Sequence, residues 1–167
     1  MAKVLKPDIL VSSIYAITPE GLKNRKIYGL ILDIDNTLVA THIKDPDEKL
    51  INHLKTLRDG GIRAIIVSNA RKERVEQFAR PLNIEYVYKA LKPLGRGFKL
   101  ALKKLSLSKE NVAIVGDQLF TDVLGGNLQG IHTILIKPID LNEPLPIRLK
   151  RIIEKPFLIN KRYEDKI

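Results

Sequence analysis

Cysteine is absent from this sequence, so neither disulfide bonds nor thiolate metal sites are available to it. Long apolar runs are also absent, and none approaches the length that a membrane-spanning helix requires. The first ten residues, MAKVLKPDIL, show neither the apolar stretch of a signal peptide nor the arginine-rich pattern of a transit peptide. The sequence has no internal repeat, low-complexity stretch or linker. These absences favour a cytoplasmic globular protein in a reducing compartment.

What is present suffices for one domain with a sizeable core, since 44% of the 167 residues are hydrophobic. We expect a single domain over residues 1–167, with residues 1–26 as an N-terminal extension and residues 144–167 as a basic C-terminal tail. Lysine and arginine outnumber aspartate and glutamate by 29 to 19, a formal net charge of +10. This charge favours anionic partners, namely phosphate esters, nucleic acid or anionic lipid surfaces, without choosing among them.

Short apolar runs alternate with segments of helical periodicity along the chain, a pattern that predicts parallel βαβ units. The expected fold class is therefore α/β: a three-layer α/β/α, Rossmann-like fold around a mainly parallel sheet. Asp45 is expected to cap the first long helix, and Pro81 to end the next one. The predicted strands cover residues 27–32, 62–67, 85–90, 111–116 and 131–136, and the predicted helices cover residues 46–61, 71–80, 95–107 and 120–129.

Polar clusters directly follow three of the predicted strands. The stretch LDIDNT contains Asp33 and Asp35, the stretch SNA begins at Ser68, and the stretch GDQLFTD contains Asp117 and Asp122. Ligands of open α/β sheets bind at the carboxyl ends of the strands, so these clusters should meet in one crevice. We thus expect residues that are far apart in the sequence to form a single site.

Carboxylates are the main chemical groups of this predicted crevice. Neighbouring carboxylates repel each other unless a cation or a reaction uses them. Four aspartates in one crevice, Asp33, Asp35, Asp117 and Asp122, indicate a hard cation with oxygen ligands, for which Mg²⁺ is the best match. Lys92 precedes a predicted helix and can place a positive charge beside that cation. A cation beside a lysine makes the crevice a phosphate site.

The same crevice offers hydrogen-bond donors for phosphoryl oxygens. Ser68 supplies a hydroxyl, Asn69 supplies an amide, and both supply backbone N–H groups. The backbone N–H groups of Asn36 and Thr37 can serve in the same way where the chain turns away from the strand. Each feature has an ordinary alternative, because serine often caps helices and paired aspartates often occupy caps and turns. Their convergence at strand ends favours the phosphate site.

These residues resemble, in order, the four motifs of the haloacid dehalogenase (HAD) superfamily. Its D-x-D-x-[TV] motif matches residues 33–37, its Ser or Thr after a strand matches Ser68, its Lys matches Lys92, and its G-D-x-x-x-x-D motif matches residues 116–122. The stretch LKPDILVSSIYAITPEGLKNRKIYGLILDIDNTLV is similar to the start of the YqeG-type HAD proteins of class IIIA. These include the phosphatidylglycerophosphate phosphatases of bacteria, mitochondria and plastids.

The resemblance implies a Mg²⁺-dependent phosphomonoesterase that converts phosphatidylglycerophosphate to phosphatidylglycerol. In this reading Asp33 is the nucleophile that forms an aspartyl-phosphate, and Asp35 is the general acid and then the general base. Lys92 balances charge on the transferring group. The resemblance also implies that Mg²⁺ is held by the Asp33 carboxylate, the Asp35 backbone carbonyl and Asp117, with Asp122 in support.

The spacing of the motifs leaves no room for a cap domain. One helix and one strand fit between Thr37 and Ser68, and one helix and a short strand fit between Asn69 and Lys92. An open site suits a lipid head group, although a capless enzyme can also use soluble nucleotide or sugar phosphates. A non-catalytic RNA- or ribosome-binding module would also suit the positive charge. The complete set of catalytic residues argues against it, so nucleic acid is not the favoured partner.

The basic tail permits two interpretations. Four of its apolar residues lie at helical spacing among basic ones: Leu145, Leu149, Ile152 and Ile153. The tail can be an interfacial helix on anionic lipid, which would make the protein peripheral at the inner face of the membrane. It can equally be a helix packed on the domain with a solvated basic face. The apolar residues of segment 1–26 likewise can pack on the sheet or meet lipid.

Overall fold

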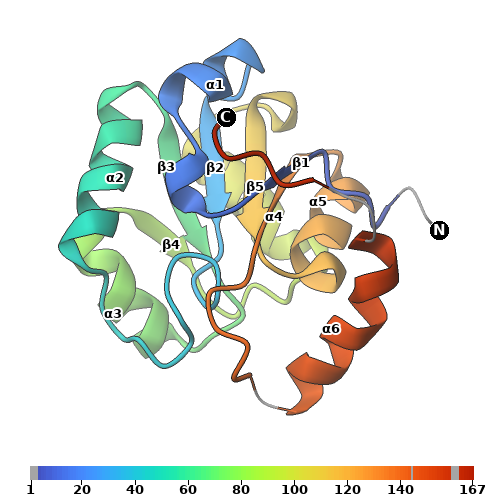
Figure 1. Cartoon of the computed structure of the whole chain (residues 1–167). Helices are drawn as coiled ribbons and strands as arrows, with labels where there is room; N and C mark the ends of the chain where they lie inside the picture. Colours follow the sequence, from blue (N-terminus) through green and yellow to red (C-terminus); the bar gives the residue numbers. More distant parts are fainter. Residues whose placement is uncertain (1–3, 144, 159–161) are drawn as a thin grey trace.

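Six parallel strands form one sheet in the computed structural model of the chain, in the order β1-β6-β5-β2-β3-β4 (Figure 1). The structure describes residues 4–143, 145–158 and 162–167. The strands are Ile9–Val11 (β1), Gly29–Leu32 (β2), Arg63–Val67 (β3), Glu85–Val87 (β4), Val112–Gly116 (β5) and His132–Ile136 (β6). The predicted α/β class with a parallel sheet is therefore confirmed.

Helices connect these strands and cover both faces of the sheet. They are α1 (Pro19–Asn24), α2 (Glu48–Asp59), α3 (Lys72–Leu82), α4 (Gly95–Leu105), α5 (Leu124–Gln129) and α6 (Leu145–Leu158). Short 3₁₀ turns lie at Ile14–Ala16 and Lys109–Asn111, and a π-helical turn, Leu119–Val123, precedes α5.

The three layers follow from the alternation of side chains along each strand. Leu30 and Leu32 of β2 face one side of the sheet and pack in a core with α1, α2 and α3. Ile31, between them, faces the other side and packs in a second core with Phe98 and Ala101 of α4. Figure 1 shows α2 and α3 together on the left and α5 at the right, with the sheet between them.

Two predicted helix boundaries are wrong. The cap of α2 is Asp47 rather than Asp45, because the Asp47 side chain accepts a hydrogen bond from the Leu50 backbone N–H at 2.8 Å. Pro81 lies inside the last turn of α3 rather than ending it. Its missing N–H removes one hydrogen bond, and the helix ends at Leu82, followed by Asn83 in the left-handed conformation.

The N-terminal segment contributes a strand that the sequence does not reveal. β1 pairs with β6, with Ile9 opposite Ile134, and three residues are too few to show a strand pattern. The apolar residues that could have met lipid are buried against the sheet: Leu10, Val11, Ile14 and Ile17. The described part of this segment, residues 4–26, therefore packs on the sheet.

No cap domain interrupts the described chain between the motifs. Residues 38–67 contain a loop, α2 and β3, and residues 70–91 contain α3 and β4. The carboxyl ends of the strands lie on the lower side of Figure 1, below β2 and beside the start of α6. Within the described ranges, no helix is long and apolar enough to cross a membrane.

Candidate active site

Parallel register brings the predicted site residues to one edge of the sheet. Leu32, the last residue of β2, lies opposite Ile66 of β3 and Val115 of β5. Asp33 and Asp117 therefore leave neighbouring strands at the same edge of the sheet, one residue apart in register. Gly116 precedes Asp117 because a Cβ at this position would collide with the Asp122 carboxyl group. The glycine thus lets Asp122 lie against the end of β5.

Three aspartates form a buried cluster at this edge. The carboxylates of Asp33, Asp117 and Asp122 have oxygen atoms within 4.8 Å of one another. Their residues are 8%, 3% and 1% exposed. Lys92 lies among them, with Nζ at 2.7 Å from Asp33 Oδ1 and 2.7 Å from Asp122 Oδ1. Asp33 directly follows β2 and Asp117 directly follows β5. Asp122 lies in the π-helical turn, and Lys92 lies in the segment before α4.

Burial and mutual repulsion shift the protonation of this cluster. Burial raises the pKa of Asp33 to about 7, with Asp122 and Asp117 adding to the shift and Lys92 opposing it. Burial also raises the pKa of Asp117 to about 6, against the lowering effect of Arg151. Burial alone would lower the pKa of Lys92, but the carboxylates of Asp122 and Asp33 outweigh it and raise that pKa. Lys92 therefore stays positively charged, but its single charge does not balance the carboxylates around it.

The loop after β2 is held by its own backbone. The Asn36 N–H donates to Val39 O at 2.7 Å and the Thr37 N–H to Ile34 O at 3.2 Å, so both N–H groups that the sequence offers to phosphoryl oxygens already have backbone partners. The Asn36 side chain instead donates to Glu143 Oε1 at 2.5 Å. The Thr37 hydroxyl donates to Asp117 Oδ1 at 3.1 Å. The Asn36 side chain thus lines the crevice beside Glu143, and the Thr37 side chain supports Asp117.

Asp35 and Ser68 both line the crevice. The Asp35 carboxylate pairs with Arg74 of α3 at 3.0 Å, which holds its orientation. The Ser68 hydroxyl accepts a hydrogen bond from the Ala70 N–H at 3.1 Å, and its own proton can be donated to a ligand. Both side chains therefore line the crevice, and their roles at a phosphate stay predictions.

Asn69 clamps the backbone of Lys92. Its Oδ1 accepts from the Lys92 N–H at 2.8 Å, and its Nδ2 donates to Lys92 O at 3.2 Å. The end of β3 thereby fixes the segment that carries the lysine, 23 residues further along the chain. The Asn69 amide thus positions Lys92, and its role in substrate binding stays a prediction.

We expect Asn69→Ala to lower kcat/KM for a phosphate ester by about tenfold, because the loss of both hydrogen bonds lets Lys92 move relative to Asp33. Steady-state kinetics would measure this. Asn52→Ala, on the exposed face of α2, removes the same side chain far from the crevice and should have no effect. An unchanged kcat/KM in Asn69→Ala would show that the clamp does not set the position of the lysine.

Arg151 of α6 reaches the same cluster, which the sequence did not predict. Its guanidinium donates to the Asp117 carboxylate, to Asp117 O at 2.6 Å and to both oxygens of Glu143, at 2.7 and 2.9 Å. It also lies 3.6 Å from Glu154 Oε2. Glu154 in turn accepts a hydrogen bond from the Phe120 N–H at 3.2 Å, in the π-helical turn beside Asp122. Glu143, just before the basic tail, and Glu154, within it, were the available signal for this contact.

The charge balance of this cluster fits a divalent cation. Five of its carboxylates are buried: Asp33, Asp117, Asp122, Glu143 and Glu154. Among the described residues, two cationic side chains contact them, Lys92 and Arg151. A hard divalent ion with oxygen ligands would supply the missing charge at the three aspartates. Their spacing therefore fits Mg²⁺.

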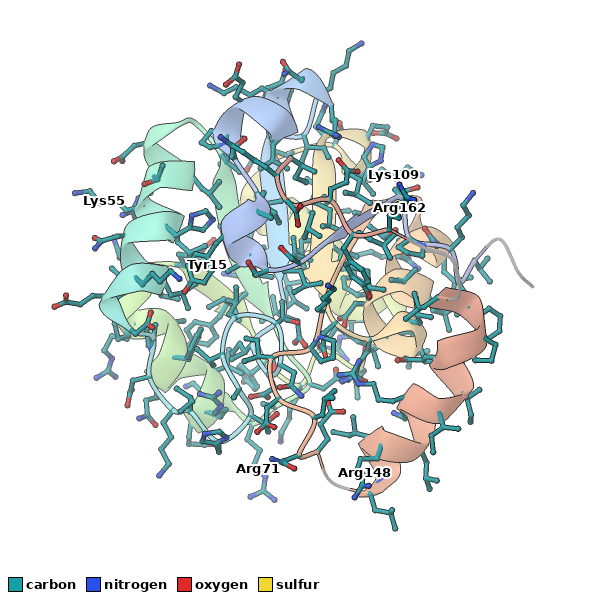
Figure 2. All side chains as sticks on the ribbon, in the orientation of Figure 1. Tyr15, Lys55, Arg71, Lys109, Arg148 and Arg162 are labelled. Carbon is teal, nitrogen blue, oxygen red and sulfur yellow. The ribbon has the colours of Figure 1, made fainter. Side chains whose placement is uncertain are left out.

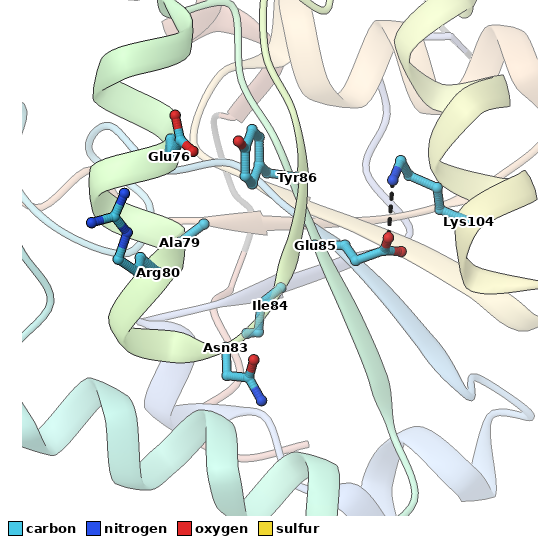
Figure 3. Close-up of a pocket in the computed structure, with 8 residues that line it drawn as sticks. All are labelled: Glu76, Ala79, Arg80, Asn83, Ile84, Glu85, Tyr86 and Lys104. Carbon is cyan, nitrogen blue, oxygen red and sulfur yellow. Dashed lines mark hydrogen bonds and ion pairs between the residues drawn. The ribbon is translucent and has the colours of Figure 1, made fainter.

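A cavity of about 240 Å³ opens over this cluster, and Asp33, Asp35, Ser68 and Lys92 are among its lining residues. Ile147 and Lys150 of α6 line it too. A wider cavity of about 590 Å³ lies elsewhere, between the end of α3 and β4, and shares no lining residue with the first (Figure 3). Its main polar contact is the exposed pair of Lys104 and Glu85, at 2.9 Å. The chemistry therefore belongs to the smaller cavity.

Known proteins resemble this chain over most of its length. It is 42% identical over 158 residues to the probable phosphatase YqeG of Bacillus subtilis (strain 168). The matched region covers 95% of this chain and 92% of that protein. It is 28% identical over 164 residues to phosphatidylglycerophosphate phosphatase 1, chloroplastic/mitochondrial, of Arabidopsis thaliana, covering 91% of this chain and 47% of that protein.

The fold and the family model agree with these relatives. The cobalt-bound deoxy-D-mannose-octulosonate 8-phosphate phosphatase (YrbI) of Haemophilus influenzae shares the fold, with a TM-score of 0.57 at 16% identity over 81% of this chain and 90% of that one. A family model described as haloacid dehalogenase-like hydrolase matches residues 43–130, more than half of the chain. The chain thus belongs to the haloacid dehalogenase-like hydrolases and is, within them, a phosphatase of the YqeG type.

Proposed function

We propose that this phosphatase hydrolyses phosphatidylglycerophosphate to phosphatidylglycerol through an aspartyl-phosphate on Asp33. The observation that carries the chemistry is the contact of Lys92 Nζ with both Asp33 and Asp122 beside Asp117, since it surrounds one point with a cation and three carboxylates. The three carboxylates and the Asp35 backbone carbonyl would hold Mg²⁺. When bound, the ion would neutralise charge on the phosphoryl group and orient it.

In the first step, a carboxylate oxygen of Asp33 attacks phosphorus, and the bond from phosphorus to the glycerol oxygen breaks. Asp35 gives its proton to the departing oxygen. Arg74 contacts one oxygen of Asp35 at 3.0 Å, so it orients the side chain and leaves the other oxygen for proton transfer. Lys92 stabilises negative charge on the phosphoryl oxygens.

In the second step, Asp35 takes a proton from a water molecule whose oxygen attacks phosphorus. The bond between phosphorus and the Asp33 oxygen breaks, which releases inorganic phosphate and restores the carboxylate. The Ser68 hydroxyl and the Asn69 backbone N–H bind phosphoryl oxygens in both steps. Within the described residues, that N–H has no hydrogen-bond partner of its own.

The lipid substrate is supported by similarity, architecture and charge. The Arabidopsis relative is named as a phosphatidylglycerophosphate phosphatase and matches 91% of this chain. The gaps between the motifs hold no cap, so a head group at a bilayer surface can approach Asp33. The formal charge of +10 favours an anionic surface, where each well-placed Lys or Arg contributes about 1 kcal/mol. The proposed location is peripheral, at the cytoplasmic face of the membrane.

A competition assay in mixed micelles tests this substrate. Phosphatidylglycerophosphate would be set against a panel of nucleotide and sugar phosphates, with Mg²⁺ present and with excess EDTA. We expect kcat/KM for the lipid to exceed that for soluble phosphates by at least about a hundredfold, because only the lipid adds binding energy from contact of the protein with the micelle surface. EDTA should abolish turnover, and Mg²⁺ should restore it.

Two results would overturn parts of this proposal. Equal or faster turnover of a soluble phosphate would exclude the lipid as the preferred substrate and leave a general phosphatase. Full activity in excess EDTA, with the metal removed and verified by elemental analysis, would exclude the cation role of the aspartates.

A further inference from the structure

Helix α6 turns its charged side inward and its apolar side outward. Glu154 is 2% exposed and the Arg151 side chain is 15% exposed, whereas Leu149 and Ile152 are 53% and 60% exposed. An ordinary surface helix has the reverse arrangement, with its apolar stripe on the core. The outward side of α6 therefore needs a separate explanation.

The outward side is a continuous apolar stripe with basic borders. Its members, at helical spacing and all more than half exposed, are Leu145, Leu149, Ile152 and Ile153. Arg148 and Lys150 lie on the two sides of this stripe, both exposed, and neither has an ion-pair partner in the described part of the chain. Figure 2 shows Arg148 at the start of α6, at the lower edge of the view. We call these four apolar residues with Arg148 and Lys150 the α6 outer face.

The ionic contacts of the inner side fix this orientation. Rotating α6 to bury Leu149 would pull Arg151 away from Asp117 and Glu143, leaving buried carboxylates without their cation. The helix therefore cannot hide its apolar stripe against its own domain. Exposed apolar patches with polar borders mark surfaces that meet a partner or a membrane.

We propose that the α6 outer face docks on an anionic lipid bilayer, with the apolar stripe in the interfacial region and the basic borders at the head groups. This matches the construction of interfacial helices, which combine an apolar stripe with lysine or arginine beside it. The excess of positive charge disfavours a second copy of the chain as the occupant, because two such faces would bring like charges together. Net charge and basic borders instead complement anionic lipid.

Docking would also place the catalytic cavity at the lipid surface, an inference that rests on the proposed lipid phosphatase function. Ile147 and Lys150, from the same helix, line that cavity, and Glu143 lines it just before α6 begins. A helix lying in the interface thus holds the cavity mouth within reach of head groups. A substrate lipid would need only to lift its phosphate toward Asp33.

The test is sedimentation of the whole chain with vesicles that contain no substrate lipid. Vesicles of phosphatidylcholine alone would be compared with vesicles that also contain phosphatidylglycerol. The variant Leu149→Gln with Ile152→Gln removes apolar surface and keeps the net charge and helix propensity. We expect it to bind anionic vesicles at least about tenfold more weakly than the unchanged protein. Its hydrolysis of p-nitrophenyl phosphate should be unchanged, since neither residue lines the cavity.

The matched control is Leu100→Gln with Tyr88→Gln. Both residues are exposed, at 44% and 42%, and both line a cavity next to β4, at the sheet edge opposite β1. This control should bind anionic vesicles as the unchanged protein does. Equal weakening in both variants would show that general surface hydrophobicity, and not the α6 outer face, drives binding.

Two further outcomes would overturn the docking proposal. Unchanged vesicle binding in the α6 variant is one. The other is a dimer of the unchanged protein in size-exclusion chromatography that the α6 variant converts to a monomer, because the face would then be covered by a second copy. Failure of the lipid substrate in the micelle assay, with vesicle binding lost in the α6 variant as expected, would contradict the proposed function alone.

Discussion

Asp33→Asn is expected to lower kcat for a chromogenic phosphate ester by at least about a thousandfold, because an amide cannot attack phosphorus as a carboxylate does. Asp33 is the first residue after β2 and contacts Lys92 at 2.7 Å, within the cluster of three aspartates. Asp117 is not positioned as a substitute, since Arg151 and Thr37 hold its carboxylate. Single-turnover kinetics with the purified variant would measure the loss.

The fold of this variant should remain intact. Asparagine has nearly the same shape as aspartate, and its neutral amide relieves repulsion from Asp117 and Asp122. Cooperative melting at a temperature close to that of the unchanged protein would establish this. Asp45→Asn is the matched control: its exposed carboxylate binds Gln77 outside the cavity, so full activity is expected. If Asp33→Asn keeps full activity, the nucleophile is another group.

Arg151→Met is expected to detach α6 from the active site. Methionine keeps the length of the side chain but removes the cation shared by Asp117, Glu143 and Glu154. Breaking a buried ionic contact of this kind costs about 3 kcal/mol. We expect faster amide hydrogen exchange over residues 145–158 and a lower melting temperature. Activity should fall by about tenfold or more, because Asp117 loses the group that orients it.

Arg148→Met provides the control on the same helix. Arg148 is exposed, and the described chain offers it no ion-pair partner, so exchange and activity should stay unchanged. Arg151→Lys should recover part of the protection, since lysine keeps the charge but cannot reproduce the forked contacts with Glu143 and Asp117. Normal exchange protection of α6 in Arg151→Met would show that the ionic cluster does not hold the helix.

Local patterns account for the part of the site that the sequence predicts. Asp33, Ser68 and Asp117 each follow an apolar strand, and parallel strands end at a common edge. The convergence of these residues can therefore be predicted without knowing any side-chain contact. Lys92 could be assigned through its resemblance to a family motif, but its contact with Asp122 comes from the folded chain.

Contacts that no sequence pattern reveals account for what the sequence did not predict. The backbone N–H groups of Asn36 and Thr37 are consumed within a local turn, by Val39 O and Ile34 O, each three residues away. Strand β1 depends on distant residues instead, because it pairs with β6, more than a hundred positions along the chain.

The sequence by itself determined the α/β class, the strand ends that carry the aspartates and the absence of a cap, because each depends on local period and spacing. Only the tertiary structure decided which side of α6 faces the domain. The helix has an apolar stripe and a charged side, and periodicity alone would bury the stripe. Arg151 lies 34 residues beyond Asp117, and the buried carboxylates there select the charged side. The reason is electrostatic: a buried carboxylate without a cation costs more than an apolar stripe left at the surface.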